Sequence, residues 1–328
     1  MVDFTVFKGG NDGVHQATSH REVGPHDVLV KITHSGLCGT DIHYKHTDMA
    51  LGHEGAGVVE EIGKDVTLFK IGDHAGWGYL HHACGHCKQC LRGAETFCAQ
   101  RKMYGEANLD QGSMGSHAVW NEDFLFPIPD ELTLENAAPL MCGGATVFNA
   151  LQFHGVKSTD RVGVIGVGGL GHLAIQFASA MGCEVVVFSG TESKKEEALH
   201  LGAREFVATK AKKELKLSKP IDHLLVTTAS QPDWKIYFPV MAPSGTIYPL
   251  TVSNDELKMP YMDIILNGLK IQGSLVAARG IHQEMLDFAA VHKIKPIIQK
   301  FALNEDGIND AFQTLEDGKM RYRGILVA

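Results

Sequence analysis

The chain has 328 residues, of which 44% are hydrophobic and 21% are charged, the balance of a globular protein with a sizeable core. Its formal net charge of −8 provides no basic surface for nucleic acid or anionic lipid, so we expect neither partner. No stretch approaches the ~18 consecutive apolar residues of a membrane span, and residues 1–10 carry no basic leader segment, so we expect a cytoplasmic protein.

The first part of the chain is rich in glycine, histidine and cysteine and has the pattern of short strands separated by turns. We predict strand-and-turn structure in four of its segments, residues 26–36, 54–63, 110–120 and 124–132. The pattern changes near Ala137, where residues 137–153 become apolar with helical spacing.

From residue 161 onward, apolar strands alternate with helices. We predict strands at 161–166, 184–189, 222–229, 245–250 and 270–276, and helices at 169–182, 191–202 and 281–293. The first of these helices repeats apolar residues at one-face spacing, namely Leu170, Leu173, Ala174, Phe177, Ala178 and Met181. Apolar strands between helices indicate an α/β fold with a parallel sheet that helices cover on both faces.

The strand at 161–166 runs directly into a glycine-rich turn. Gly166, Gly168 and Gly171 enclose Gly169 and Leu170 in the spacing G-x-G-x-x-G. The three glycines permit a tight turn, close approach of a pyrophosphate and close packing of the next helix, whose N-terminus favours phosphate. The strand before it and the periodic helix after it predict a dinucleotide-binding site at this turn.

The second strand of this region ends in residues that distinguish the two nicotinamide dinucleotides. NAD sites usually place an acidic residue there, but this chain has Ser189, followed by Gly190, Thr191 and Lys194. Hydroxyls and a lysine suit a 2′-phosphate, so the sequence favours NADP(H) over NAD(H). Glu192 opposes this interpretation unless it lies at the N-terminus of the following helix, where a carboxylate is favourable.

Four of the seven cysteines lie in one short segment with the spacing C-x2-C-x2-C-x7-C. These residues are Cys84, Cys87, Cys90 and Cys98. Four thiolates complete the tetrahedral shell of Zn²⁺ and leave no position for a substrate, so we predict a structural zinc rather than the alternative iron–sulfur cluster. We expect His81, His82 and His86 to lie beside this site without binding the metal.

A catalytic zinc needs three protein ligands and one open position. Cys38, His53 and Cys142 have suitable side chains, and Cys142 lies where the pattern of the chain changes. Together with a downstream dinucleotide site, these three residues form a coherent candidate for a catalytic zinc site. With the structural zinc of the four-cysteine segment, we expect two zinc ions per chain. We expect Cys183, which precedes a strand, to have a packing role only.

The motifs, in their order, resemble those of the zinc-dependent medium-chain alcohol dehydrogenases, and in particular the cinnamyl alcohol dehydrogenase-like subgroup. The residues that carry the resemblance are GLCGTDIH (36–43), GHEGAG (52–57), the four-cysteine segment, LMCGGATVF (140–148), GVGGLG (166–171), SKKEEAL (193–199) and RYRGILVA (321–328). The resemblance covers essentially the whole chain.

The resemblance implies a Rossmann doubly wound parallel sheet together with a GroES-like β-barrel catalytic domain. We expect the catalytic domain at 1–142, the Rossmann domain at 143–279 and a return to the catalytic domain at 280–328. It also implies a homodimer formed along the edge of the Rossmann sheet, for which the strand at 270–276 would supply the edge.

The resemblance also implies roles for individual residues. Cys38, His53 and Cys142 would bind the catalytic zinc, with Glu54 beside it as a neighbour or alternate ligand, and Asp41 would orient the His53 imidazole. Thr40 and His43 would complete the site as a proton relay.

The implied reaction is reversible hydride transfer between NADP(H) and an alcohol/aldehyde pair, with aromatic or medium-sized apolar aldehydes as the expected small-molecule substrates. Residues 44–52 form a shorter segment than plant members usually have, so plant-type monolignol specificity does not follow. Several aromatic or apolar residues could form an apolar pocket, namely Trp77, Tyr79, Met103, Tyr104 and Trp120, although each is more often a core residue. One alternative is an NAD(P)-dependent polyol dehydrogenase, and an alternative of another class is a non-catalytic dinucleotide-binding zinc protein.

Overall fold

The computed structural model describes residues 1–11, 13–253 and 255–328, and these residues divide into two compact units. Unit 1 comprises Met1–Ala145 and Val276–Ala328, and unit 2 comprises Thr146–Leu275. The predicted boundaries lie within four residues of these limits, while the catalytic and cofactor-binding roles assigned to the two parts stay predictions.

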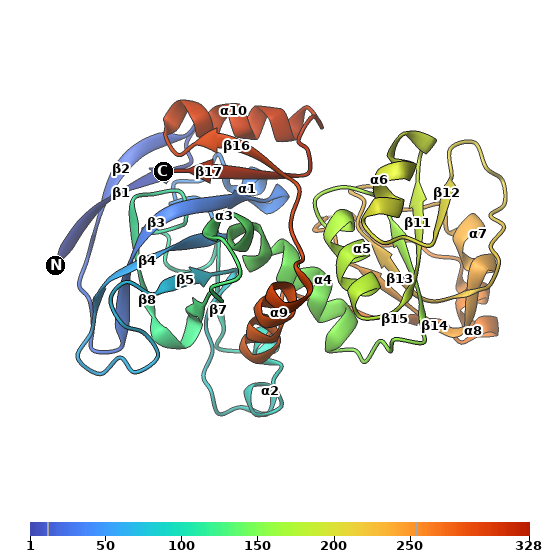
Figure 1. Ribbon diagram of the computed structural model, residues 1–328, viewed down its shortest axis with the longest axis horizontal. Coiled ribbons are helices and arrows are strands. Elements are labelled where there is room, and N and C mark those ends of the chain that lie inside the picture. The colour runs from blue at the N-terminus through green and yellow to red at the C-terminus, as the bar shows by residue number, and fades with distance from the viewer. Residues whose placement is uncertain (12, 254) are drawn as a thin grey trace. The chain divides into compact units, whose positions relative to one another are not determined.

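Unit 1 is built mainly from strands. They are β1 (Val2–Lys8), β2 (His15–Arg21), β3 (Asp27–Leu37), β4 (Gly55–Ile62), β5 (His74–Trp77), β6 (Leu80–His82), β7 (Lys102–Met103), β8 (His117–Asn121), β9 (Phe126–Pro127), β16 (Ile298–Ala302) and β17 (Arg323–Val327). The main sheet has the order β16-β17-β3-β4-β5-β9, and β8 also pairs with β3 (Figure 1).

Short helices connect the strands of unit 1. They are α1 (Gly39–Tyr44), α2 (Lys88–Leu91), η1 (Glu95–Phe97), η2 (Glu122–Phe124), α3 (Leu134–Ala137), η3 (Ala138–Met141), α9 (Arg279–His292) and α10 (Glu305–Glu316). The helix α4 (Gly143–Gln152) contains the unit boundary. The predicted apolar helix at 137–153 is therefore interrupted: Cys142, with φ −124° and ψ −59°, separates η3 from α4.

Unit 2 contains a sheet in which all described strand pairs are parallel, in the order β12-β11-β10-β13-β14-β15. The strands are β10 (Arg161–Ile165), β11 (Glu184–Ser189), β12 (Glu205–Ala208), β13 (Ile221–Val226), β14 (Met241–Pro249) and β15 (Lys270–Ile271). The helices are α5 (Gly171–Ala180), η4 (Glu192–Lys194), α6 (Lys195–His200), α7 (Trp234–Tyr237), η5 (Phe238–Val240) and α8 (Tyr261–Asn267).

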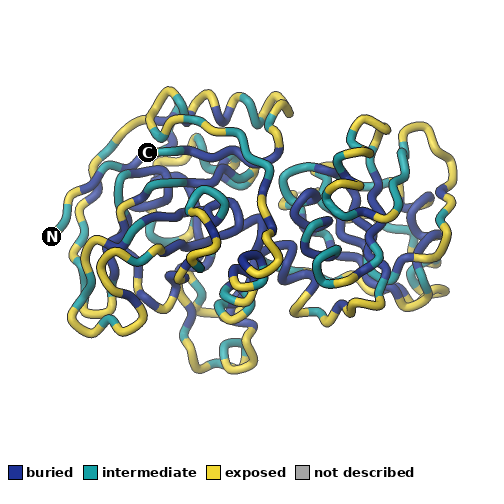
Figure 2. Tube along the Cα trace, viewed as in Figure 1, coloured by how far each residue is buried: buried dark blue, intermediate teal, exposed yellow. Residues whose placement is uncertain are grey.

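The sequence pattern of unit 2 follows from burial on both faces of its sheet. Every residue of β10 is buried, as are the four central residues of β11. Figure 2 shows dark blue, buried stretches in the interior of unit 2. On α5, Leu173 and Phe177 are fully buried, as its periodicity predicts. The prediction for unit 2 was incomplete: β12, α7 and α8 were not predicted, and the strand expected at 270–276 is limited to Lys270–Ile271.

Within the part of the chain that the structure describes, no helix combines the length and apolar character needed to span a membrane.

Candidate active site and dinucleotide site

Antiparallel pairing of β3 with β4 brings together the first residues of the candidate site. Ser35 pairs with Gly55, and the Gly36 N–H donates to the Glu54 carbonyl over 2.8 Å. Cys38 directly follows β3, and His53 and Glu54 directly precede β4, so the strand ends place all three together. Gly36 is required here because a Cβ at this position would lie 2.0 Å from the Glu54 Oε2 atom.

Cys142 completes a compact group with these residues. One ligand atom from each of Cys38, His53, Glu54 and Cys142 lies within 4.8 Å of the others, and three of the four side chains are buried. The break between η3 and α4 presents the Cys142 side chain to the group.

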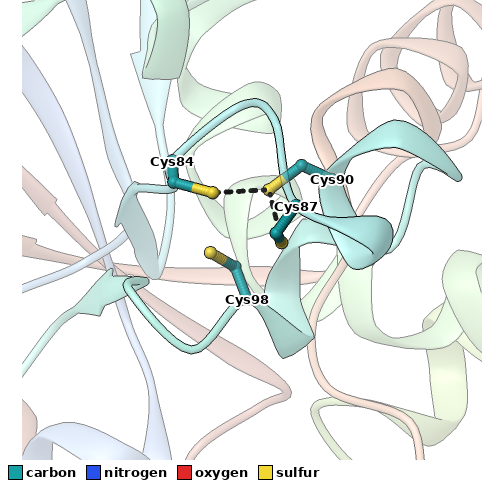
Figure 3. Close-up of side chains that lie close together, drawn as sticks. All are labelled: Cys84, Cys87, Cys90 and Cys98. Atoms are coloured by element: carbon teal, nitrogen blue, oxygen red, sulfur yellow. Dashed lines mark hydrogen bonds between the residues drawn. The ribbon is translucent and has the colours of Figure 1, made fainter.

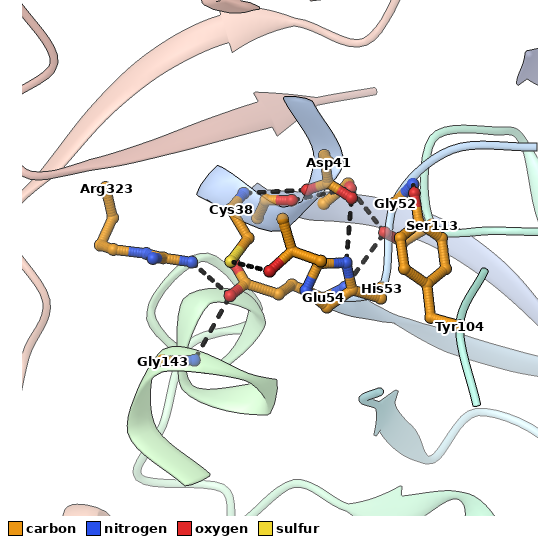
Figure 4. Close-up of polar contacts among 12 residues, drawn as sticks. Cys38, Asp41, Gly52, His53, Glu54, Tyr104, Ser113, Gly143 and Arg323 are labelled. Atoms are coloured by element: carbon orange, nitrogen blue, oxygen red, sulfur yellow. Dashed lines mark hydrogen bonds and ion pairs between the residues drawn. The ribbon is translucent and has the colours of Figure 1, made fainter. Parts of the chain in front are cut away.

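The imidazole of His53 is oriented from behind by Asp41. Its Nδ1 atom lies 2.9 Å from the Asp41 Oδ1 atom, and both side chains are fully buried (Figure 4). A histidine that binds a metal through Nε2 donates its Nδ1–H to such a carboxylate, so this contact orients Nε2 for a metal. The buried Nε2 atom has no hydrogen-bond partner among the described residues.

The second carboxylate near the group, Glu54, is paired with an arginine from β17. Its Oε1 atom accepts from the Arg323 guanidinium and from the Gly143 N–H, while Oε2 has no hydrogen-bond partner among the described residues (Figure 4). Burial raises the pKa of Glu54 to about 7, against the opposing effect of the Arg323 charge. The sequence gives no local signal for this contact, because Arg323 is 269 residues away.

The electrostatics of the group favour a thiolate at Cys38. A hydrogen bond with Cys142, followed by the influence of His53, lowers the pKa of Cys38 well below its usual value. The same hydrogen bond raises the pKa of Cys142. Burial opposes protonation of His53, yet the negative charges of Asp41 and Cys38 raise its pKa.

This donor set fits a zinc ion. Two sulfurs and one imidazole nitrogen, with an orphaned lone pair on Nε2 directed by a carboxylate, are the ligands that Zn²⁺ prefers at a catalytic site. The unpartnered Oε2 atom of Glu54 would be the fourth donor within reach.

The two residues of the predicted proton relay lie on α1. The Thr40 hydroxyl lies 3.7 Å from the Cys38 Sγ atom, so the structure brings Thr40 to the group. His43 is one helical turn further and is exposed to solvent.

The four clustered cysteines form a second group, in the lobe Cys84–Cys98 between β6 and β7 (Figure 3). Their sulfurs lie within 4.8 Å of one another, with Cys87 to Cys90 at 3.5 Å and Cys84 to Cys90 at 3.9 Å. A tetrahedron with Zn–S bonds of ~2.3 Å has sulfurs about 3.8 Å apart, so the lobe also fits zinc. None of the seven cysteines, all of them described, forms a disulfide.

The neighbouring histidines and Cys183 differ in their burial. His81 is buried, and its ring centroid lies 4.5 Å from that of Trp120. Neither His82 nor His86 belongs to the metal-binding groups found among the described residues. Cys183 is buried in unit 2, with its Sγ atom 3.4 Å from the Lys157 carbonyl oxygen.

The candidates for an apolar pocket divide clearly by burial. Four of them are buried and belong to the core rather than to a pocket wall, namely Trp77, Met103, Tyr104 and Trp120. Tyr79 is partly exposed, and its ring contacts the His53 ring edge-on at 5.4 Å between centroids.

Unit 2 contains a cavity of about 660 Å³ at the carboxyl ends of its strands. Of the predicted cofactor residues, Gly166, Gly168, Ser189, Gly190 and Lys194 line it. Two positions in the turn require glycine. Gly166 has a positive φ of +96°, and a Cβ atom added at Gly171 would lie only 2.0 Å from the Gly166 carbonyl oxygen.

The other predicted cofactor residues lie beside this lining. Gly169 and Leu170 connect the turn to α5, with Leu170 as its N-cap, and Thr191 precedes η4. Glu192 is the first residue of η4 and forms an ion pair with Lys195 at 3.2 Å. Glu192 therefore lies at the start of a helix, where a carboxylate is favourable, as the interpretation in favour of NADP(H) requires.

Sequence reasoning missed Lys212, which also lines the cavity. The turn after β12 is hydrogen-bonded to the end of β11, with Thr209 N to the Ser189 carbonyl at 2.8 Å and Lys210 N to the Gly190 carbonyl at 3.0 Å. Lys194 donates from Nζ to the Val167 carbonyl over 2.6 Å, at the edge of the glycine turn. Because β12 was not predicted, nothing in the sequence placed Lys212 beside these residues.

Comparison with known proteins agrees with this fold and these groups. Residues 24–130 match the family model "Alcohol dehydrogenase GroES-like domain", and residues 169–291 match "Zinc-binding dehydrogenase". An alcohol dehydrogenase from Geobacillus stearothermophilus is 36% identical over 312 residues, which cover 92% of this chain and 91% of that protein.

Two solved structures are similar over nearly the whole chain. A cinnamyl alcohol dehydrogenase from Sorghum bicolor has a TM-score of 0.91 at 29% identity, and covers 99% of this chain and 98% of its own. The cinnamyl alcohol dehydrogenase from Helicobacter pylori, complexed with NADP(H), has a TM-score of 0.89 at 31% identity with the same coverage.

The chain belongs to the zinc-dependent medium-chain alcohol dehydrogenases, and within them to the cinnamyl alcohol dehydrogenase-like kind. The predicted family, two-part fold and oxidoreductase class are thereby confirmed, and the non-catalytic alternative is not supported. The polyol dehydrogenase alternative stays a prediction.

Proposed function

We propose that the chain catalyses reversible hydride transfer between NADP(H) and an alcohol/aldehyde pair, with two zinc ions per chain. The observation that carries the proposal is the compact group of Cys38, His53 and Cys142, in which Nε2 of the buried His53 lacks a hydrogen-bond partner among the described residues and Asp41 contacts Nδ1. We propose these three residues as ligands of the catalytic zinc and the four cysteines of the lobe as ligands of the structural zinc.

A zinc ion held by these ligands would supply Lewis acidity toward the oxygen of the substrate. The residues of the chain would orient the ligands, compensate charge and transfer the proton. Asp41 keeps the proton on Nδ1 of His53, and Arg323 compensates the charge of Glu54. The Thr40 hydroxyl, close to Cys38, would accept the alcohol proton while passing its own proton toward His43. The exposed His43 would exchange that proton with solvent.

The proposal that the cofactor is NADP(H) rests on the cavity of unit 2. Ser189 ends β11 where an acidic residue would favour NAD, and two lysines, Lys194 and Lys212, line the same cavity. Asp233 also lines it, but its carboxylate accepts from the Lys235 N–H as the N-cap of α7. The similar Helicobacter pylori enzyme was solved with NADP(H).

The function is tested with the purified holoenzyme by following the loss of NADPH absorbance with a panel of aromatic, aliphatic and polyol-derived carbonyl substrates. We expect turnover with apolar aldehydes, and we expect Cys38→Ser to abolish it in a protein that stays folded. Cys183→Ser is the matched control, because it removes a buried thiol outside both groups and should remain active. A folded Cys38→Ser variant with wild-type turnover would contradict the catalytic assignment.

Cofactor preference is tested separately with Lys212→Ala. We expect its affinity for NADPH to fall roughly tenfold, because a charge-assisted contact with the 2′-phosphate is lost, while its affinity for NADH stays unchanged. Lys213→Ala is the control, since Lys213 is exposed but does not line the cavity. Equal losses for both cofactors, or equal effects of both substitutions, would rule out this role for Lys212.

We also propose that the protein forms a homodimer. The support is an exposed apolar surface on α8 beside the edge strand β15, in which Tyr261 is 78% exposed and Leu266 is 75% exposed. A second copy of the chain would cover these side chains.

A further inference from the structure

The carboxylate of Asp41 is the point at which the hydrogen bonds behind His53 converge. Its Oδ1 atom accepts from the His53 Nδ1–H over 2.9 Å, and its Oδ2 atom accepts from the Cys38 N–H over 2.9 Å. Asp41 therefore connects two of the three proposed zinc ligands. Whatever fixes this carboxylate also fixes the direction of the Nε2 lone pair.

Tyr104 supports the same histidine through its ring and through the backbone before it. Its side chain is almost completely buried, and its ring centroid lies 4.6 Å from that of His53 with 37° between the ring planes. Its hydroxyl oxygen accepts from the Gly52 N–H over 3.0 Å, directly before His53 in the chain (Figure 4). Burial, followed by the nearby Asp41 charge, raises the pKa of Tyr104 above its usual value, so the phenol keeps its proton.

Tyr104 is itself held by a rigid surrounding. Its N–H donates to the Tyr79 carbonyl over 3.0 Å, as a continuation of the β6–β7 pair that encloses the four-cysteine lobe. The Tyr44 ring packs against it edge-on at 5.2 Å. Gly105 has φ +82°, and a Cβ there would lie 2.3 Å from the Tyr44 ring, so the turn after Tyr104 is tightly packed.

We propose that Tyr104 is a positioning residue for the catalytic zinc site. Its hydroxyl holds the backbone at Gly52, directly before His53, and its ring limits the tilt of the His53 imidazole, so that Nε2 stays directed at Cys38 and Cys142. Tyr104 is not one of the proposed zinc ligands and would act through His53. The inference rests on the proposed function, because it assumes zinc at this group.

The test compares full-length Tyr104→Phe with the wild type, both loaded with zinc. The substitution keeps the ring and removes only the hydroxyl. We expect zinc release from the catalytic site to a colorimetric chelator to become roughly tenfold faster, as for other groups that support a ligand. We also expect kcat to fall while KM for NADPH stays unchanged, and the visible bands of the cobalt-substituted protein to shift. The catalytic site is recognised as the release phase that Cys38→Ser lacks.

Two further variants separate positioning from stability. Tyr44→Phe removes a neighbouring hydroxyl from the same aromatic cluster, and its zinc release and cobalt spectrum should match the wild type. Tyr104→Leu removes the ring as well and should exceed the effect of Tyr104→Phe if it folds. A Tyr104→Phe protein with altered thermal stability but unchanged zinc release and cobalt spectrum would overturn the proposal. A wild-type protein that holds no zinc at Cys38 would instead overturn the proposed function.

Discussion

His282 is an ionisable side chain that is buried without a polar partner for one of its ring nitrogens. It lies on α9 with 4% exposure, and its ring stacks on Phe126 with 3.9 Å between centroids. Its Nε2 atom has no hydrogen-bond partner among the described residues. Desolvation lowers the pKa of His282 to about 3, so the folded protein keeps this ring neutral.

His282 should therefore weaken the fold in mild acid. An unfolded histidine has a pKa of ~6.5, so below that pH the unfolded chain binds a proton that the folded chain excludes until about pH 3. The free energy of unfolding should fall through this window, by roughly 2 kcal/mol at pH 5 from this residue. His282→Phe, which keeps the stacking on Phe126, should remove that part of the pH dependence in urea denaturation.

The control is His292→Gln, because His292 lies on the same helix and is exposed. Its unfolding free energy should follow the wild-type pH profile. Parallel profiles for wild type and His282→Phe between pH 7 and pH 5 would show that the buried ring does not couple to folding.

The four-cysteine lobe is attached to the rest of unit 1 at both its ends and its middle. Its ends continue into β6 and β7, which pair with each other. In its middle, the buried Glu95 Oε1 atom accepts from the Arg279 N–H at 2.8 Å and from Arg279 Nε at 3.2 Å, at the start of α9. The lobe is thus a connector between the β6–β7 pair and α9.

Loss of one lobe ligand should release its metal and loosen this connection. We expect Cys90→Ser to contain one zinc fewer per chain by atomic emission and to unfold at a lower temperature than the wild type, because the folding energy of a structural zinc site depends on metal binding. Cys183→Ser again serves as the control, with both zinc ions retained. A Cys90→Ser protein with wild-type zinc content and stability would contradict the assignment of a structural zinc.

The elements that were predicted correctly have local causes. The spacing of the four cysteines, the glycine turn at 166–171 and the uninterrupted burial of β10 each follow from residues close together in the chain. The strand β12 and the short edge strand β15 have weaker local patterns. As a result β12 was not predicted, and β15 was predicted too long. Cys142 was expected in a helical run, whereas the structure places it at the break between two helices.

The residues that hold the candidate ligands in place could not be predicted in the same way. Arg323 reaches Glu54, and Tyr104 reaches Gly52, only because strand pairing brings distant segments together. Nothing in the composition of RYRGILVA or of the residues around Tyr104 distinguishes a buried partner of a carboxylate from a surface arginine or a core aromatic residue.

On the scale of the whole molecule, the proposed homodimer would cover the exposed apolar surface of α8. Leu266→Glu should weaken a homodimer at least roughly tenfold, because it replaces a side chain that association would bury by a charged one. Sedimentation equilibrium at several concentrations measures the change. Leu199→Glu, which alters an exposed leucine on α6 of the same unit, should leave the association unchanged. A monomeric wild type at all concentrations would contradict the proposed dimer.

Unit 1 is discontinuous, and this imposes an order on biosynthesis. The ribosome makes residues 146–275 before it makes β17, the strand that pairs with His34–Leu37 of β3 and carries Arg323. Until β17 emerges, that part of β3 has an open edge and the Glu54 carboxylate has no guanidinium to compensate its burial. Unit 2 can therefore fold on the nascent chain while Cys38, His53 and Cys142 still await their final electrostatic environment. The surroundings of the proposed catalytic group are thus completed only when the end of the polypeptide emerges, later than all of its proposed ligands.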